Sequence, residues 1–235
     1  MKDGLWLEDA SFRYGQLPVL HETDLHVPPG RTLIVTGENG VGKSTLLYLC
    51  AGLLNATSGH VWLDGHLAAA KKPSELMRQG VRRGFVFAHG GLLSNLSALA
   101  NVTLALRYHA DVFGVDEEDL TARAREALAE LRVSPADFHA LPAHLSAGVR
   151  KRVAIARALA INPNFVYFDD PDAGLDSATR RLVYERLESF RDNSTITVMI
   201  ATNSRQLIER LGIVPLELAH GHLLPEDQSR RSLRA

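Results

Sequence analysis

The stretch Gly37-Glu38-Asn39-Gly40-Val41-Gly42-Lys43-Ser44-Thr45 (GENGVGKST) matches the pattern G-x-x-x-x-G-K-[ST] at every fixed position. Its glycines let the backbone curl, so that successive N–H groups point inward and hold phosphate oxygens. In this pattern Lys43 reaches the β- and γ-phosphates, and the hydroxyl of Ser44 is a ligand of Mg²⁺. The sequence therefore predicts a nucleoside triphosphate site that consists of Gly37, Asn39, Gly40, Val41, Gly42, Lys43, Ser44 and Thr45.

The residues on either side of this loop agree with that interpretation. Thr32–Thr36 (TLIVT) has the composition of a short buried strand. After the loop, residues 46–54 carry leucines and Cys50 at helical spacing, which predicts a helix whose N-terminus faces a bound anion. A dinucleotide-binding fingerprint is the nearest alternative, but the glycines at 37, 40 and 42 are in the wrong order for it, and it does not need the lysine.

Composition limits the classes of protein that fit. The chain has 235 residues, of which 46% are hydrophobic, and its formal net charge of −1 gives no bulk attraction to nucleic acid or anionic lipid. The N-terminus lacks the apolar core of a signal peptide, and no apolar run reaches the roughly 18 residues of a membrane span. Cys50, the one cysteine, excludes an intramolecular disulfide. We therefore expect a cytosolic chain without a nucleic-acid partner, which reaches a membrane only through another protein.

The rest of the chain alternates between strands and helices. Residues 5–35 are β-rich, residues 85–150 are mostly helical, and further helices are expected over residues 149–160 and 177–191. FVYFDD (165–170) and TITVMIAT (195–202) have the composition of buried strands, and such alternation predicts a largely parallel sheet. We expect one domain over residues 1–225, with a helical subdomain at about 88–150, and a charged tail at 226–235.

A second motif lies about 20 residues before FVYFDD. Leu145-Ser146-Ala147-Gly148-Val149 resembles the LSGGQ signature of ATP-binding cassette (ABC) ATPases, with alanine and valine in place of the usual glycine and glutamine. Small residues and a hydroxyl at the start of a helix can contact a phosphate. In the family that phosphate belongs to the nucleotide of the opposite subunit. The resemblance therefore implies a dimer to which Ser146, Ala147 and Gly148 contribute in trans.

The resemblance covers roughly residues 5–205 and implies further roles. Tyr14 matches the aromatic residue that stacks on adenine, Asp169 matches the Walker B aspartate that holds Mg²⁺ through water, and Asp176 matches the D-loop aspartate that crosses the dimer interface. ATP and Mg²⁺ are the implied cofactors. The implied fold is α/β, a P-loop NTPase with an ABC-type core. It would have a mostly parallel sheet, an N-terminal antiparallel β subdomain and an inserted helical subdomain.

Three positions depart from the family pattern, all in its catalytic machinery. Ala88 occupies the position of the Q-loop glutamine, unless the alignment slips by one residue and places His89 there. Asp170 replaces the catalytic glutamate, and Asn203 stands at the H-loop histidine position. Alanine offers no hydrogen bond, and aspartate sets its carboxylate back by one methylene, about 1 Å, a misplacement that can cost about 10²-fold in rate. We expect ATP binding through Lys43 to be intact and hydrolysis to be slow.

Residues 84–106 (GFVFAHGGLLSNLSALANVTLAL) look like the matching segment of the Mla-type ATPases, which power lipid trafficking with an MCE-domain partner. In those proteins a glycine-leucine run follows the Q-loop and an Asn-Val pair opens a helix, which Asn101-Val102 matches here. Related importers and lipoprotein-release ATPases share much of this segment. The resemblance implies lipid as the cargo and an MCE-domain protein as a partner.

The remaining histidines and basic residues suggest no further site. The ten histidines come without cysteines or carboxylates in a metal-ligand arrangement, so we expect them to be surface or core residues. Arg150-Lys151-Arg152 is interpreted as a helix face near the dimer interface rather than a nucleic-acid patch. The arginines at 78, 82 and 83 are interpreted as solvated charges.

These features together predict an ABC-type ATPase subunit, a homodimer by default, that docks on a membrane permease at the cytoplasmic face of the inner membrane. Slow ATP hydrolysis would then be coupled to lipid transport. One alternative is an ATP-gated regulatory or structural subunit, which the three catalytic departures favour somewhat. A soluble ABC protein of ribosomes or DNA repair is less favoured, because the chain has no room for a second cassette or a long coiled coil. A heterodimer whose partner supplies an intact site is a further alternative.

Overall fold

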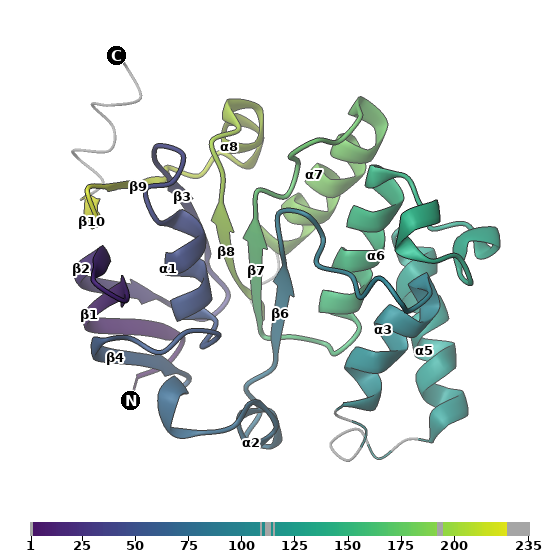
Figure 1. Ribbon diagram of the computed structural model, residues 1–235, viewed down its shortest axis with the longest axis horizontal. Coiled ribbons are helices and arrows are strands. Elements are labelled where there is room, and N and C mark those ends of the chain that lie inside the picture. Colours follow the sequence, from purple (N-terminus) through teal and green to yellow (C-terminus); the bar gives the residue numbers. More distant parts are fainter. Residues whose placement is uncertain (1, 109, 111–113, 115, 192–194, 225–235) are drawn as a thin grey trace.

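The computed structural model describes residues 2–108, 110, 114, 116–191 and 195–224, so the charged tail expected at residues 226–235 lies outside the described residues. A six-stranded sheet with the order β10-β9-β3-β8-β7-β6 runs through the molecule (Figure 1). Its strands are β3 (Thr32–Thr36), β6 (Arg83–Val86), β7 (Phe165–Asp169), β8 (Thr197–Ala201), β9 (Leu216–Ala219) and β10 (His222–Leu224). Every neighbouring pair except β9 and β10 is parallel, which confirms the predicted sheet.

A second sheet is antiparallel and has the order β2-β1-β4-β5. It consists of β1 (Leu5–Tyr14), β2 (Leu17–Val27), β4 (Ser58–Leu63) and β5 (His66–Leu67). Helix α1 (Lys43–Cys50) shares one hydrophobic cluster with this sheet and with the parallel sheet, and the Cys50 thiol is buried there. The antiparallel part that the family resemblance implies is thus present.

Most of the other helices pack against the face of the parallel sheet that is opposite to α1 (Figure 1). They are α3 (Ala98–Arg107), α5 (Glu117–Glu130), α6 (Ala147–Leu159), α7 (Ser177–Arg191) and α8 (Arg205–Leu211), with α2 (Pro73–Arg78) and 3₁₀ turns at Ala68–Ala70, Pro135–Asp137 and Pro142–His144 elsewhere. Residues 87–97 form neither helix nor strand, which corrects the helical interpretation of residues 85–150. Among the described residues, no helix is both long and apolar enough to span a membrane. Whether residues 88–150 form a separate subdomain stays a prediction.

Strand β7 is buried on both faces of the sheet. Successive side chains of a strand point to opposite faces, and here Val166 and Phe168 join the cluster with the helices, whereas Phe165 and Tyr167 join the cluster with α1. This two-sided burial explains why FVYF is an uninterrupted apolar run. It also fixes Asp169 at the carboxyl end of the sheet, beside the loop that precedes α1.

Candidate nucleotide-binding site

The P-loop (residues 37–45) connects β3 to α1 through a tight turn. Gly37 has a φ of 144°, and a Cβ there would lie 2.3 Å from the carbonyl oxygen of Leu218. Gly42, which precedes the first residue of α1, is left-handed with a φ of 112°. Glycine alone adopts such angles readily, so the glycine spacing of the motif is required by the backbone path of this turn. The predicted strand and loop are present, and the predicted helix is α1, which ends at Cys50, so residues 51–54 lie beyond it.

Lys43 folds back over the first residues of the P-loop. Its Nζ donates to the carbonyl oxygens of Gly37 and Glu38 at 2.8 and 2.9 Å, and its side chain is buried. Burial lowers the pKa of Lys43, while the carboxylates of Asp170 and Asp169 act in the opposite direction. The ammonium is therefore held at the mouth of the loop by weak acceptors, which phosphate oxygens could replace with stronger, charge-assisted bonds.

Ser44 and Asp169 lie 125 positions apart in the sequence and are brought together here. The hydroxyl of Ser44 donates to Oδ1 of Asp169 at 2.9 Å, and the hydroxyl of Tyr48 lies 3.5 Å from the other carboxylate oxygen. Burial and the neighbouring Asp169 both raise the pKa of Tyr48, so its hydroxyl stays protonated. A hydroxyl and a carboxylate at the end of a rigid strand form an oxygen donor set that fits Mg²⁺.

Asp170 leaves the strand in a different conformation from Asp169. Its φ is +39°, in the left-handed region that aspartate tolerates better than most residues, and its N–H donates to the carbonyl oxygen of Ala201 at 2.9 Å. Burial raises the pKa of Asp170, and the charge of Asp169 raises it further, while Lys43 opposes both effects. The two aspartates are thus adjacent in sequence but turned by the backbone toward different surroundings.

Asn203, at the H-loop position, contacts the P-loop directly. Its Oδ1 accepts the N–H of Gly37 at 3.2 Å, and its Nδ2 donates to Oδ1 of Asn39 at 3.3 Å. Asn203 lies two residues after the end of β8, which is the neighbour of β3 in the sheet. The structure therefore brings Asn203 to the P-loop, and its contact with a terminal phosphate stays a prediction.

The Q-loop position follows β6, whose neighbour in the sheet is β7. Ala88 and His89 both line a small cavity of about 180 Å³ between the start of α6 and the turn at residues 173–175. Both stay candidates for the Q-loop position. The backbone carbonyl of Ala88 accepts from Lys151 Nζ at 2.6 Å, so the loop is tied to α6 through its main chain.

The signature residues lie at the start of α6, next to Thr179, the residue of α7 that bonds to Asp176. Ser146 caps α6 by accepting the N–H of Val149 at 3.2 Å, and Asp176 accepts from the N–H and hydroxyl of Thr179 at 2.9 and 3.0 Å. These bonds from Thr179 lower the pKa of Asp176. A Cβ on Gly148 would lie 2.5 Å from the Thr179 hydroxyl, so the α6 start packs tightly on α7. Among the described contacts, no hydrogen bond joins Ser146, Ala147, Gly148 or Asp176 to the P-loop, and their action in trans stays a prediction.

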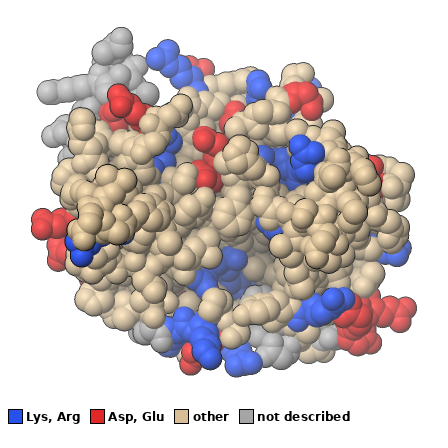
Figure 2. Space-filling view, viewed as in Figure 1, with Lys and Arg blue, Asp and Glu red and all other residues tan. Residues whose placement is uncertain are grey.

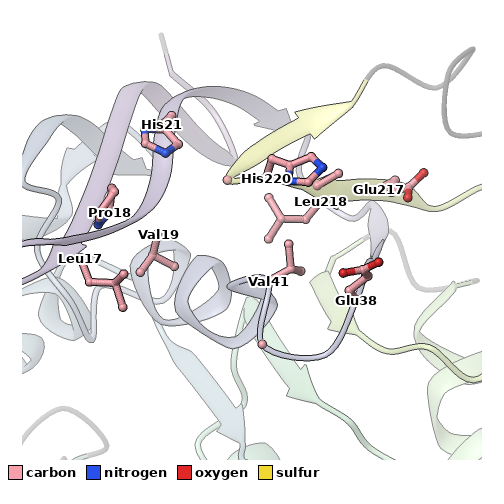
Figure 3. Close-up of a pocket in the computed structure, with 12 residues that line it drawn as sticks. Leu17, Pro18, Val19, His21, Glu38, Val41, Glu217, Leu218 and His220 are labelled. Atoms are coloured by element: carbon pink, nitrogen blue, oxygen red, sulfur yellow. The ribbon is translucent and has the colours of Figure 1, made fainter.

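Tyr14 is the last residue of β1, and its side chain is half-exposed. Its ring forms an edge-to-face pair with the ring of Phe12, with 4.8 Å between the ring centroids. Close by in the sequence, the start of β2 lines a cavity of about 440 Å³ that also touches the P-loop and the β9–β10 turn. Figure 3 shows Val19, Val41 and Leu218 on its walls. Sequence reasoning missed Val19 as a residue beside the P-loop, because only the hairpin from β1 to β2 brings it there.

Of the charges interpreted as a surface feature from the sequence, Lys151 is buried and Arg83 is half-buried, which corrects that interpretation. Lys151 is only 3% exposed, and its ammonium donates to backbone carbonyls inside the molecule. Arg83 donates to the carbonyl oxygen of Ala51 at 2.5 Å, and burial lowers its pKa. The sequence did not predict this burial, because the charge of a residue and its place in a helix or strand do not reveal which carbonyl groups of distant segments it can reach.

A complete P-loop between a parallel strand and a helix, with a Walker B aspartate beside it, defines a P-loop nucleotide-binding protein. A model of the ABC transporter family matches residues 20–173, more than half of the chain, and the chain belongs to that family. This confirms the family named from the signature motif and the fold class expected from it.

Curated relatives and solved structures agree with that membership. The chain is 35% identical over 213 residues to the methionine import ATP-binding protein MetN 3 of Pectobacterium atrosepticum and 33% identical to MetN of Escherichia coli K12. Each match covers 90% of this chain and 60% of the relative, so the chain spans about 60% of the length of these relatives. Two dimeric structures of the bacterial ABC transporter cassette MJ0796, one of them bound to ADP and Pi, match with a TM-score of 0.83 and 28% identity. They cover 94% of this chain and 97% of the cassette.

Proposed function

We propose that this chain is the ATP-binding subunit of an ABC transport complex, which binds Mg²⁺·ATP and couples its slow hydrolysis to a membrane permease. The observation that carries the proposal is the hydrogen bond between Ser44 and Asp169, 2.9 Å long, beside a complete P-loop. This bond joins the two residues that would hold the magnesium ion of a bound triphosphate. Bound Mg²⁺ would neutralise charge on the β- and γ-phosphates.

In this proposal the chain's own residues divide the work. Lys43 moves from the carbonyls of Gly37 and Glu38 to the phosphates, and the backbone N–H groups of the P-loop hold the phosphate oxygens. Ser44 and Asp169 would hold the metal. The Asp170 carboxylate orients the attacking water from a position about 1 Å too far back, which slows the reaction rather than the binding.

A second copy of the chain completes the site in the proposal. Ser146, Ala147 and Gly148 of that copy contact the γ-phosphate, and its Asp176 crosses the interface. The two similar cassette structures are described as dimeric, which supports a homodimer here. Tyr14 stacks on adenine with its half-exposed ring.

An apolar groove supports docking on a membrane protein. The groove has a volume of about 480 Å³ and lies between β6, α3 and α6. It is lined by Leu53, Leu93, Leu104 and Tyr108, whose side chains are all exposed. Exposed apolar side chains gathered in one groove mark an interaction site. We place the chain at the cytoplasmic face of the inner membrane, held there by the permease.

The charges of the molecule also suit a protein partner. Figure 2 shows basic and acidic side chains scattered over the visible face, with uncharged residues between them. Together with the net charge of −1, this gives no bulk electrostatic attraction to nucleic acid.

Two observations bear on the cargo. The relatives reported above are named methionine import proteins, whereas residues 84–106 resemble the Mla-type ATPases of lipid trafficking with their MCE-domain partner. The match to methionine import proteins extends over 213 residues and is the broader of the two. We therefore place import of a small molecule first and lipid second. The permease and any binding protein that co-purify with the chain would decide between them.

An ATP-gated regulatory subunit is the second candidate, because Ala88, Asp170 and Asn203 all depart from the catalytic pattern. Such a subunit would use ATP binding and dimerisation and would hydrolyse almost nothing. ATP turnover by the purified complex with its permease separates the two. Turnover that rises with cargo supports transport, and nucleotide-dependent dimerisation without turnover supports the regulatory role.

The first test is nucleotide binding by Lys43→Ala and Ser44→Ala, measured with a fluorescent ATP analogue with and without Mg²⁺. We expect Lys43→Ala to weaken binding at least about tenfold, because a charge-assisted contact is worth roughly 1.5–3 kcal/mol. Ser44→Ala should remove most of the magnesium dependence. Lys2→Ala is the control, since Lys2 pairs with Glu8 on the antiparallel sheet. Full-strength binding by Lys43→Ala, or no binding by the wild type, would contradict the proposal.

A further inference from the structure

Lys151 is a buried cation that lies outside the motifs described above. It lies in the second turn of α6, a short distance after the signature residues, and is 3% exposed. Its Nζ donates to three backbone carbonyl oxygens: Ala88 at 2.6 Å, and Phe87 and Asp170 at 3.3 Å each. One side chain thus connects α6, the Q-loop and the residue after Walker B.

The surroundings of Lys151 are matched to an ammonium group. A lysine has three N–H donors, and three carbonyl oxygens receive them. Burial lowers the pKa of Lys151, while the carboxylates of Asp169, Asp170 and Asp172 raise it and favour the charged form. Three acceptors and three nearby acids compensate the cost of burying this charge.

The neighbouring arginines of the basic cluster have other partners. Arg150 donates to the carbonyls of Pro142 and Leu145, and Arg152 donates to those of Leu131 and Arg132. These carbonyls belong to segments between α5 and α6. Of the three cations, only Lys151 has described contacts with both the Q-loop and Asp170.

The hydrogen bond from Lys151 helps to fix Asp170 in a strained backbone conformation. Asp170 has a φ of +39°, and its N–H is bound to Ala201 of β8. Its carbonyl accepts from Lys151 on one side and from the N–H of Ala173, at 3.3 Å, on the other. The direction of the Asp170 carboxylate depends on this backbone conformation, which β8 and α6 fix from opposite sides.

We infer that Lys151 is a positioning residue for ATP hydrolysis, which sets the place of Asp170 and couples it to the signature helix. The inference rests on the proposed function. Ala88 has no side chain with which to link the Q-loop to the reaction centre, and Lys151 makes that link through the main chain instead. Because Ser146 caps the same helix, a shift of the signature toward a second copy moves the lysine that holds Asp170.

The kinetic test compares Lys151→Met, Lys151→Gln and Arg152→Met under single-turnover conditions with Mg²⁺·ATP. Lys151→Met should lower the hydrolysis rate at least about tenfold with little change in ATP affinity, because small misplacements of a catalytic group cost rate. Lys151→Gln, which keeps two N–H donors, should restore part of the loss. Arg152→Met is the control, since it also removes a cation bound to carbonyls but leaves Asp170 untouched.

A double-mutant cycle with Asp170→Ala separates positioning from a general structural effect. If Lys151 acts through Asp170, Lys151→Met lowers the rate of the wild type but not the residual rate of Asp170→Ala. Equal losses in both backgrounds, or a Lys151→Met rate equal to that of the wild type, would overturn the inference.

Hydrogen exchange of the nucleotide-free protein gives a readout that needs no activity. Lys151→Met should speed exchange in the peptides that contain residues 87–90 and 170–175, whereas Arg152→Met should affect residues 131–133 instead. Unchanged exchange in residues 170–175 would contradict the inference even if the chain binds ATP. A wild type that binds no ATP would contradict the proposed function alone, because the exchange comparison would still show whether Lys151 holds Asp170.

Discussion

At the scale of single residues, Asp169 and Asp170 are held by different contacts. Asp169 ends β7 and accepts from Ser44, so its carboxylate faces the P-loop. Asp170 follows in a left-handed conformation, with its backbone bound to Ala201 and Lys151. In the proposed function, the acid pair in FVYFDD is a metal-binding position followed by a position that orients water, and the aspartate at the second position is one methylene shorter than the family's glutamate.

Asp170→Glu should speed ATP hydrolysis by up to about 10²-fold, because it returns the carboxylate to the expected distance. Asp170→Ala should slow hydrolysis while ATP affinity stays the same. Release of phosphate under saturating Mg²⁺·ATP measures both. Asp172→Glu is the matched control, since it adds the same methylene and keeps the negative charge, and the Asp172 carboxylate accepts from the Tyr184 hydroxyl at 2.6 Å. If Asp170→Ala hydrolyses ATP as fast as the wild type, Asp170 has no catalytic role.

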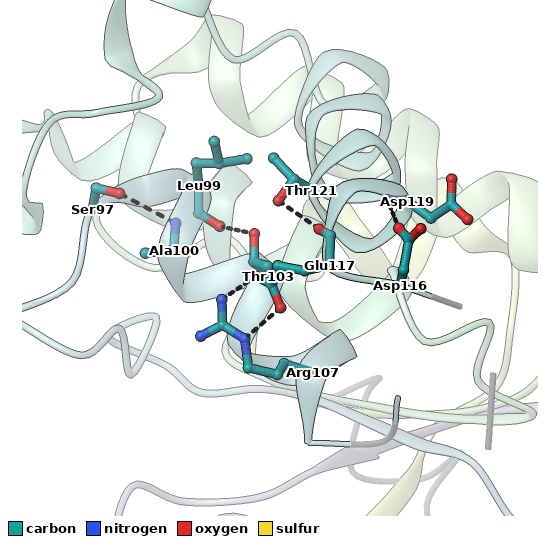
Figure 4. Close-up of polar contacts among 9 residues, drawn as sticks. All are labelled: Ser97, Leu99, Ala100, Thr103, Arg107, Asp116, Glu117, Asp119 and Thr121. Atoms are coloured by element: carbon teal, nitrogen blue, oxygen red, sulfur yellow. Dashed lines mark hydrogen bonds and ion pairs between the residues drawn. The ribbon is translucent and has the colours of Figure 1, made fainter. Parts of the chain in front are cut away.

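At the scale of elements, a hydroxyl cap and a carboxylate cap define the starts of α3 and α5. Ser97 accepts the N–H of Ala100 at the start of α3, and Asp116 accepts that of Asp119 at the start of α5 (Figure 4). An exposed ion pair between Arg107 and Glu117 joins the same two helices. A cap satisfies a backbone donor that has no helical partner, whereas an exposed ion pair competes with water.

Ser97→Ala should therefore lower the free energy of unfolding by about 0.5–2 kcal/mol through loss of the α3 cap. Ser97→Asp should retain most of the stability, because a carboxylate caps equally well. Glu117→Gln is the comparison and should change stability less than Ser97→Ala does. Chemical denaturation followed by circular dichroism measures all three. A larger loss in Glu117→Gln than in Ser97→Ala would show that the ion pair matters more than the cap.

At the scale of the whole molecule, the residues of the proposed site lie in two separate places on one chain. The P-loop, Asp169 and Asn203 gather at the carboxyl end of the parallel sheet. The signature residue Ser146 and the D-loop residue Asp176 instead bond to residues of their own helices, at the starts of α6 and α7. A second copy facing the first would bring the signature of one chain to the P-loop of the other. Dimerisation should then depend on nucleotide.

We expect the slow variant Asp170→Ala to dimerise when Mg²⁺·ATP is added, as measured by light scattering after gel filtration. Adding Ala147→Arg should prevent the dimer and leave ATP binding by the monomer unchanged, because Ala147 is exposed and its replacement keeps the Ser146 cap. Ser189→Arg, at an exposed position late in α7, is the control and should not affect dimerisation. Dimers that persist in Ala147→Arg would contradict the proposed interface.

The sequence by itself determined the P-loop, the strands and helices around it, and the family, because these depend on residues that are close in the chain. The glycines of residues 37–42 fix a local backbone path, and the apolar run before Asp169 predicts a buried strand whatever its neighbours are. The three catalytic departures are likewise visible as single letters, and so the expectation of slow hydrolysis comes from the sequence alone.

The tertiary structure decided which distant groups meet at the site. The contacts of Asn203 with Gly37, and of Lys151 with Ala88 and Asp170, join segments separated by 166, 63 and 19 positions. A basic cluster after a signature motif gives no sign that its middle residue is buried, since exposure depends on the segments that pack over α6. The sequence thus specifies the residues available for ATP chemistry, whereas packing determines which cation holds Asp170, because burial is a property of the whole assembled chain.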